Sequence, residues 1–205
     1  MKEAISLARS SVHDHGGGPF GAVIVCQDKI VGRGWNQVTR LFDPTAHAEV
    51  MAIRDACRTL QRFDLAGCEI YTSCEPCPMC LSAIYWARLD RIFYACTRSD
   101  AGLIGFDDEF IYQQIPLENA ARAVPMIQLS RENACAVFQE WQTKPDKVMY
   151  KRRRCSIAMK IASGVAGDGI PTCPPGSPKA AIASRIASRT EIASINGGSP
   201  TALLP

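Results

Sequence analysis

The sequence has no apolar run of the roughly 18–20 residues that a membrane-spanning helix needs. The stretch 1–21 also lacks the continuous apolar segment and cleavage site of a secretory signal peptide. We therefore expect a cytoplasmic protein with no membrane partner. The 205 residues are 47% hydrophobic, which is ordinary for a globular protein, and the length predicts one domain or one domain plus an appendage.

Disulfide-scaffold features are missing as well, although the chain has ten cysteines. The cysteines are scattered, and several end or interrupt apolar runs such as AVIVC and IFYAC, where a thiol behaves as a small core residue. A secreted disulfide scaffold would be shorter and poorer in core residues. We expect reduced cysteines in a reducing compartment.

Aromatic residues are absent after Tyr150, where the charge balance also changes. Residues 1–150 hold 15 Lys and Arg against 18 Asp and Glu, whereas residues 151–205 hold 8 against 2. A segment rich in Ala, Ser, Gly and Pro buries too little apolar surface to offset its ordering entropy. We expect a folded domain at 1–150 and a disordered basic tail at 151–205. The KRRR run at 151–154 fits either a patch for nucleic acid or a membrane surface, or a solvated extension, and we favour the extension.

Helical and strand patterns alternate along the first 150 residues. We expect helices at 2–12, 46–60, 78–87 and 132–143, and strands at 21–26, 30–35, 69–73, 91–96 and 126–129. The first two strands flank a turn at 27–29 and form a hairpin. A hairpin followed by alternating helices and strands predicts an α/β fold, a three-layer α-β-α sandwich around a mixed sheet of about five strands.

Candidate metal ligands lie at the starts of two of the expected helices: His47 in PTAHAEV, and Cys77 and Cys80 in PCPMC. The positive end of a helix dipole favours thiolates and a bound hydroxide. One His and two Cys leave the fourth tetrahedral position of a zinc ion open, as in catalytic sites. The alternatives are a structural zinc knuckle or buried free thiols. Cys74 also precedes Cys77 by three residues, but it lies before the helix, and we interpret it as a packed thiol.

Glu49 lies two residues from His47 and is the candidate catalytic residue. Zinc lowers the pKa of its water from about 15.7 to about 7, which supplies hydroxide near neutral pH. Glu49 can take the proton of that water and deliver it to a leaving nitrogen, which is worth about 10²–10⁴ in rate. His47-Ala48-Glu49 together with Pro76-Cys77-Pro78-Met79-Cys80 forms the signature of zinc deaminases.

Longer stretches carry a closer resemblance: GGPFGAVIV, DPTAHAEV, YTSCEPCPMCLSAIYWAR and GFDDEFIY. With them, residues 1–150 resemble the bacterial guanine deaminases of the cytidine-deaminase-like fold. The resemblance implies one zinc ion per chain and hydrolysis of guanine to xanthine and ammonia in purine catabolism or salvage, by attack of zinc-bound hydroxide on the amino-bearing carbon. The tRNA adenosine deaminases share the zinc core and a DPTAHAE-like stretch, so tRNA adenosine or another nucleobase or nucleoside is the alternative substrate.

The resemblance also implies a set of substrate-binding residues: Phe20, Asn36, the backbone N–H of Ala48, Phe106, Asp108 and Tyr150. Tyr150 would close the pocket, and the family's dimers can exchange their C-terminal segments, so a homodimer is expected. Independently, guanine presents N1–H and N2–H₂ donors that a carboxylate would accept. Without the resemblance, the acidic run 107–109 could be a solvated turn, Asn36 a turn cap and Phe20 a core residue.

Two other classes of function are alternatives: a nucleic-acid-acting enzyme and a non-enzymatic zinc module. An enzyme that flips a nucleic-acid base into the same pocket would suit the basic tail, but residues 1–150 are net acidic. A non-enzymatic zinc module would not need a spare acid–base residue such as Glu49, and it usually has four protein ligands. The sequence therefore predicts a small-molecule deaminase that does not act on nucleic acid.

Overall fold

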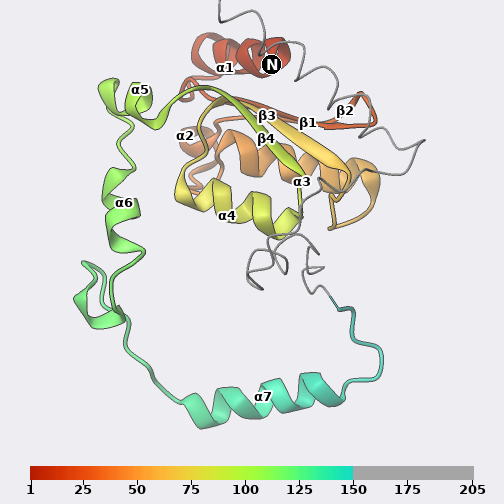
Figure 1. The fold of residues 1–205 in the computed structure, drawn as a ribbon, viewed down its shortest axis with the longest axis vertical. Helices are drawn as coiled ribbons and strands as arrows, with labels where there is room; N and C mark the ends of the chain where they lie inside the picture. Colours follow the sequence, from red (N-terminus) through yellow and green to blue (C-terminus); the bar gives the residue numbers. More distant parts are fainter. Residues whose placement is uncertain (150–205) are drawn as a thin grey trace, which may run out of the picture. The chain divides into compact units, whose positions relative to one another are not determined.

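The computed structural model, which describes residues 1–149, contains a four-stranded mixed sheet (Figure 1). The strands are β1 (Gly21–Cys26), β2 (Lys29–Trp35), β3 (Cys68–Cys74) and β4 (Arg91–Cys96), in the order β2-β1-β3-β4. β1 pairs antiparallel with β2 and with β3, whereas β3 and β4 are parallel. The tail 151–205 and Tyr150 lie outside the described residues, so the boundary at 150 stays a prediction.

Helices cover both faces of this sheet. α1 (Lys2–Asp14) packs on one face, mainly against β1, while α3 (Ala48–Leu60) and α4 (Pro78–Ala87) lie on the other (Figure 1). The three-layer prediction is therefore confirmed, and these helix bounds agree with the sequence pattern within two residues. The remaining helices are α2 (Val38–Leu41), α5 (Arg98–Leu103), α6 (Glu109–Gln114), η1 (Asn119–Ala121) and α7 (Arg131–Thr143).

Small residues bring the backbone of α3 directly against β2. Ala48, Ala52 and Ala56 are fully buried on α3, and the glycines of β2 face them. A Cβ added at Gly34 would lie 2.1 Å from the carbonyl oxygen of Ala48, and one at Gly32 would lie 2.5 Å from that of Ala52. No larger side chain fits between the strand and the helix, so this contact fixes where α3 begins.

The fifth expected strand, Met126–Leu129, is wrong as an element of this chain. The segment has no strand pairing, and Ile127 and Leu129 are each 80% exposed. A strand forms only when its backbone groups pair with a neighbour, and among residues 1–149 no strand pairs with the outer edge of β4. The helices α5 and α6 were not predicted, because six residues are too few to show a helical period.

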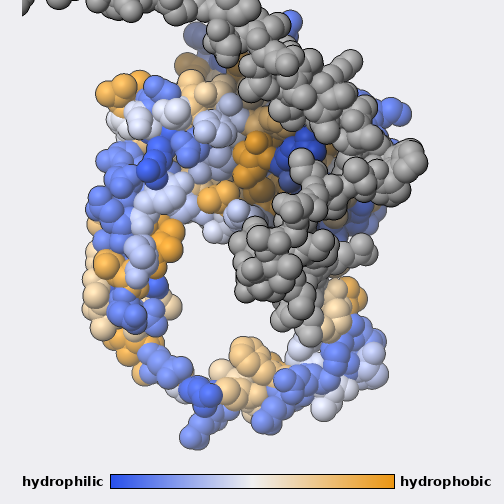
Figure 2. Space-filling model, in the orientation of Figure 1, coloured by the Kyte–Doolittle hydropathy of each residue, from blue (hydrophilic) through white to orange (hydrophobic). Residues whose placement is uncertain are grey.

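α7 forms where the sequence pattern predicts a helix, but it has no buried residue within the described chain. Val137 and Phe138 are both more than half exposed. Figure 2 shows hydrophobic surface on α6 and α7. Among residues 1–149, no helix is long and apolar enough to span a membrane.

Candidate active site

The N-termini of α3 and α4 converge at one end of the sheet. His47 is the residue before α3 and Cys77 the residue before α4, and both have extended backbone conformations. Pro78 begins α4, where its missing N–H costs nothing because a first-turn N–H has no intrahelical acceptor. Side chains at these two positions therefore lie at the positive ends of two helix dipoles.

The three predicted metal ligands meet at this point. His47 Nδ1 lies 3.6 Å from Cys77 Sγ and 3.5 Å from Cys80 Sγ. A tetrahedral zinc ion with Zn–S of about 2.3 Å and Zn–N of about 2.0–2.1 Å would hold such N and S atoms about 3.6 Å apart. The donor set and its spacing fit zinc, and among the described residues this is the one cluster of at least three such side chains close enough to hold a metal ion.

The cluster favours a thiolate on Cys77. Hydrogen bonding to Cys80, and then to His47, lowers the pKa of Cys77 to about 4 despite partial burial. The same hydrogen bond and burial raise the pKa of Cys80, while the bond to Cys77 raises that of His47. Because a coordinating thiol is deprotonated outright, a bound cation would reverse the preference of Cys80.

Glu49 lies in the first turn of α3 and is only 6% exposed. Its Oε2 accepts a hydrogen bond from the Cys80 thiol at 3.4 Å, and its Oε1 accepts one from the Thr72 hydroxyl at 3.5 Å. Burial raises the pKa of this carboxyl. A carboxyl with a raised pKa beside a metal cluster suits proton transfer near neutral pH.

A cavity of about 890 Å³ opens over this cluster. It is lined by residues that the sequence singled out: Phe20, Asn36, His47, Glu49, Cys77, Phe106 and Asp108. The structure thus brings together most of the predicted site from five separate stretches of sequence. Cys80 and Ala48 are fully buried and do not line the cavity, and Tyr150 lies outside the described residues.

The purine-binding candidates have geometry suited to a flat ring. Phe20 and Phe106 meet edge to face with ring centroids 4.9 Å apart. The Asn36 carboxamide oxygen accepts the backbone N–H groups of Gly18 and Val38, each at 3.4 Å, which leaves its NH₂ group for another partner. Ala48 is the first residue of α3, a position at which the backbone N–H has no intrahelical acceptor. Burial raises the pKa of Asp108, with the Cys77 charge as a further cause.

Sequence reasoning missed Arg98 as a residue that lines the cavity. Its guanidinium lies 4.7 Å from the centroid of the Tyr112 ring and 3.8 Å from a Glu109 carboxylate oxygen. Its backbone N–H donates to Glu75 Oε2, and Glu75 also lines the cavity. The order of elements could have indicated Arg98, because it follows β4. The carboxyl ends of the parallel strands β3 and β4 lie at the same edge of the sheet.

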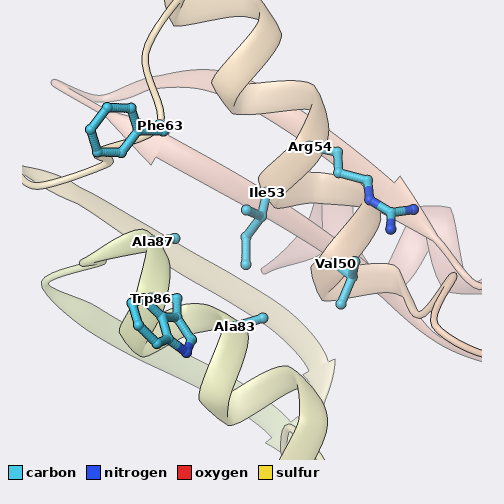
Figure 3. A pocket seen from close by; sticks show the side chains of 7 residues that line it. All are labelled: Val50, Ile53, Arg54, Phe63, Ala83, Trp86 and Ala87. Carbon is cyan, nitrogen blue, oxygen red and sulfur yellow. The ribbon is translucent and has the colours of Figure 1, made fainter. Parts of the chain in front are cut away.

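A second cavity, of about 580 Å³, lies between α3 and α4, where Val50 and Ile53 face Ala83 and Trp86 (Figure 3). Apart from Arg54, its lining side chains are apolar. It holds no metal-ligating or acid–base group of the kind gathered over His47, so the chemistry belongs to the first cavity.

Comparisons with known proteins agree with this geometry. A model of the cytidine and deoxycytidylate deaminase zinc-binding region matches residues 1–96. Guanine deaminase of Bacillus subtilis (strain 168) is 49% identical over 150 residues, which are 73% of this chain and 96% of that protein. Its X-ray structure, with the same identity and coverage, superposes with a TM-score of 0.71. The tRNA-specific adenosine deaminase of Aquifex aeolicus (strain VF5) is 42% identical over 105 residues, 51% of this chain and 69% of that protein.

Removing any one of the three clustered donors should release zinc. We expect metal analysis to find about one zinc ion per chain in the unaltered protein and much less in His47→Ala, Cys77→Ser or Cys80→Ser, since a catalytic site has only three protein ligands. Cys74→Ser is the matched control and should keep its zinc. If Cys74→Ser lost zinc while Cys80→Ser retained it, the ligand assignment would be wrong.

Proposed function

We propose that this chain, which belongs to the zinc-dependent cytidine and deoxycytidylate deaminase family, hydrolyses guanine to xanthine and ammonia in purine breakdown or salvage. One observation carries the proposal: a single cavity joins His47, Glu49 and Cys77 to purine-binding candidates such as Asn36 and Asp108. That cavity belongs to a chain that matches nearly the whole length of a guanine deaminase at 49% identity.

His47, Cys77 and Cys80 would hold the zinc ion, which supplies a nucleophile at neutral pH by lowering the pKa of a bound water to about 7. Glu49 holds a proton on its carboxylate and transfers it to the leaving amino nitrogen, a contribution of about 10²–10⁴ in rate. Burial raises the pKa of this carboxyl, so that it binds a proton more tightly than an exposed glutamate. Because thiolate ligands must stay reduced, we place the enzyme in the cytoplasm.

The cavity walls select guanine by its donors and its flat shape. Asp108 accepts hydrogen bonds from guanine N–H groups, while the carboxamide of Asn36 and the backbone N–H of Ala48 donate to ring acceptors. Phe20 and Phe106 pack against the ring system. A site built to pair buried N–H groups rejects analogues that lack them by about 10⁴–10⁵.

Deamination of adenosine in tRNA is the alternative, and it has less support. The tRNA-specific relative from Aquifex aeolicus matches 51% of this chain, against 73% for the guanine deaminase. Residues 1–150 carry more acidic than basic side chains, which repels a polyanion. No observation on the described residues favours a nucleic-acid substrate specifically.

We further propose a homodimer in which the two chains exchange their C-terminal segments. Within residues 1–149, the outer edge of β4 has no partner strand, and the apolar segment 126–129 has no sheet to join. α7 likewise exposes Val137 and Phe138. An unpaired edge is a ready site for contact with another chain, and a second copy would cover this edge and supply a surface for α7. Tyr150 would then close the partner's cavity.

The proposed activity is tested by ammonia release from guanine, adenine, cytosine, cytidine and a tRNA substrate, measured side by side with zinc-loaded protein. We expect turnover of guanine alone, and a loss of about 10²–10⁴ in kcat for Glu49→Gln with zinc retained. Turnover of tRNA alone would instead place the protein among base-flipping enzymes.

Asp108 and its neighbour Asp107 form a matched pair for testing recognition. Asp108→Ala should lower kcat/KM for guanine by roughly 10- to 150-fold, the effect of losing a hydrogen bond to a charged group. Asp107→Ala should change it little, because Asp107 Oδ1 accepts the backbone N–H of Glu109. Both variants should keep their zinc. The opposite pattern would move the recognition role to Asp107.

Segment exchange predicts that two defective chains restore each other. In a mixed dimer of Glu49→Gln and Tyr150→Ala chains, one exchanged site carries both changes and the other carries neither. Co-expression should therefore give guanine turnover well above that of either variant. A mixture of Glu49→Gln with His47→Ala should stay inactive, because both residues belong to the same half of the site. A dimer whose Glu49→Gln and Tyr150→Ala mixture recovers nothing would argue against exchange.

A further inference from the structure

Ser11 is a polar residue in the buried stripe of α1. With Ala4 and Ala8 it occupies positions one helical turn apart, and its side chain is fully buried. A hydroxyl at such a position is costly unless it makes a hydrogen bond. Ser11 Oγ donates one to the backbone carbonyl of Asn36, at 3.2 Å.

Gly17 completes a tight junction around that carbonyl. Its backbone N–H donates to the Ser11 carbonyl at 2.9 Å. A Cβ added to Gly17 would lie 2.4 Å from the Asn36 carbonyl oxygen and 2.6 Å from Ser11 Oγ. Three separate segments therefore meet at the Asn36 carbonyl oxygen. They are the last turn of α1, the loop at Gly17 and the residue after β2.

The side chain of Asn36 is held less firmly than its backbone. Its carboxamide oxygen accepts from Gly18 and Val38 at 3.4 Å each, which is long for an N–H···O bond. The backbone N–H of Asn36, in contrast, donates to the Phe20 carbonyl at 3.1 Å. The next residue, Gln37, donates its N–H to the Ala46 carbonyl at 2.9 Å, directly before His47. The orientation of the carboxamide thus depends on a backbone whose carbonyl Ser11 holds.

From this geometry we propose that Ser11 is a positioning residue, which sets the Asn36 carboxamide for binding the purine. Ser11 acts through the Asn36 backbone, since Ser11 itself does not line the cavity. The proposal rests on the guanine deaminase function above for its kinetic consequence. Its structural consequence, a fixed backbone at Asn36, does not depend on the substrate.

Ser11→Ala tests the inference with Ser10→Ala as its matched control. Ser10 neighbours Ser11 on the same helix, but it is partly exposed and its hydroxyl donates to the Asp14 carboxylate. We expect Ser11→Ala to raise KM for guanine about 5- to 30-fold, because a buried carbonyl loses its partner. kcat should stay within about threefold, as when binding alone is weakened. Zinc content should be unchanged, and Ser10→Ala should match the unaltered protein throughout.

Gly17→Ala is a second way to disturb the Asn36 carbonyl. The added methyl group must displace the Asn36 carbonyl, so KM should rise as in Ser11→Ala with zinc retained. Hydrogen exchange without substrate gives a second readout: the amides of Gly18 and Val38, which donate to the carboxamide, should exchange faster in both variants and not in Ser10→Ala.

The possible outcomes separate this inference from the proposed function. Unchanged KM and unchanged exchange in Ser11→Ala would overturn it. A parallel loss of kcat, zinc and melting temperature would also overturn it, because Ser11 would then be merely structural. If the unaltered protein releases no ammonia from guanine, the proposed function is wrong, and the exchange rates of the Gly18 and Val38 amides alone decide the role of Ser11.

Discussion

The close approach of α3 to β2 is the contact on which the site depends. Gly34 and Gly32 leave no side chain between the strand and the helix, and Ala48 and Ala52 complete the contact from the other side. Because the backbones touch, the start of α3 cannot shift along the strand without a clash. The position of His47 relative to Cys77 follows from that register. A metal site with ligands from two helices needs such a constraint, since a tetrahedral ion tolerates little error in distance.

The electrostatic character of the site follows from the same arrangement. Two helix N-termini point at one small volume, and each places a metal-ligating side chain there. Hydrogen bonding to Cys80 and His47 lowers the pKa of Cys77, whereas burial raises the pKa of Glu49 in the first turn of α3. Cys77, in the cluster, and Glu49, in contact with Cys80, therefore differ in the protonation state that they favour. That division suits one residue to binding a cation and the other to moving a proton.

The burial of apolar side chains differs between the first 96 residues and the later part of the domain. Residues 1–96 form a packed core, while segment 126–129 and α7 expose apolar side chains. Within residues 1–149, α7 has no buried residue and the outer edge of β4 has no partner strand, and proteins rarely leave such surfaces uncovered. Assembly with a second copy would satisfy both, and it would make the completeness of each cavity depend on its partner. Purine binding and association would then be linked.

The sequence by itself determined the ends of most core elements and the zinc signature, and it predicted Glu49 as the proton-transfer residue. These features are local: proline at the start of α4, glycine before β1, and ligands at fixed spacings along the chain. The family resemblance also named Asn36 and Asp108. What only the tertiary structure decided is which distant segments meet. It placed Arg98 beside the cavity, Thr72 against Glu49 and Ser11 against Asn36, and among the described residues it left 126–129 without a strand partner. A single sequence records no contact between residues far apart, because hydrogen bonds and packing between segments depend on the register of strands and helices, which no local pattern encodes.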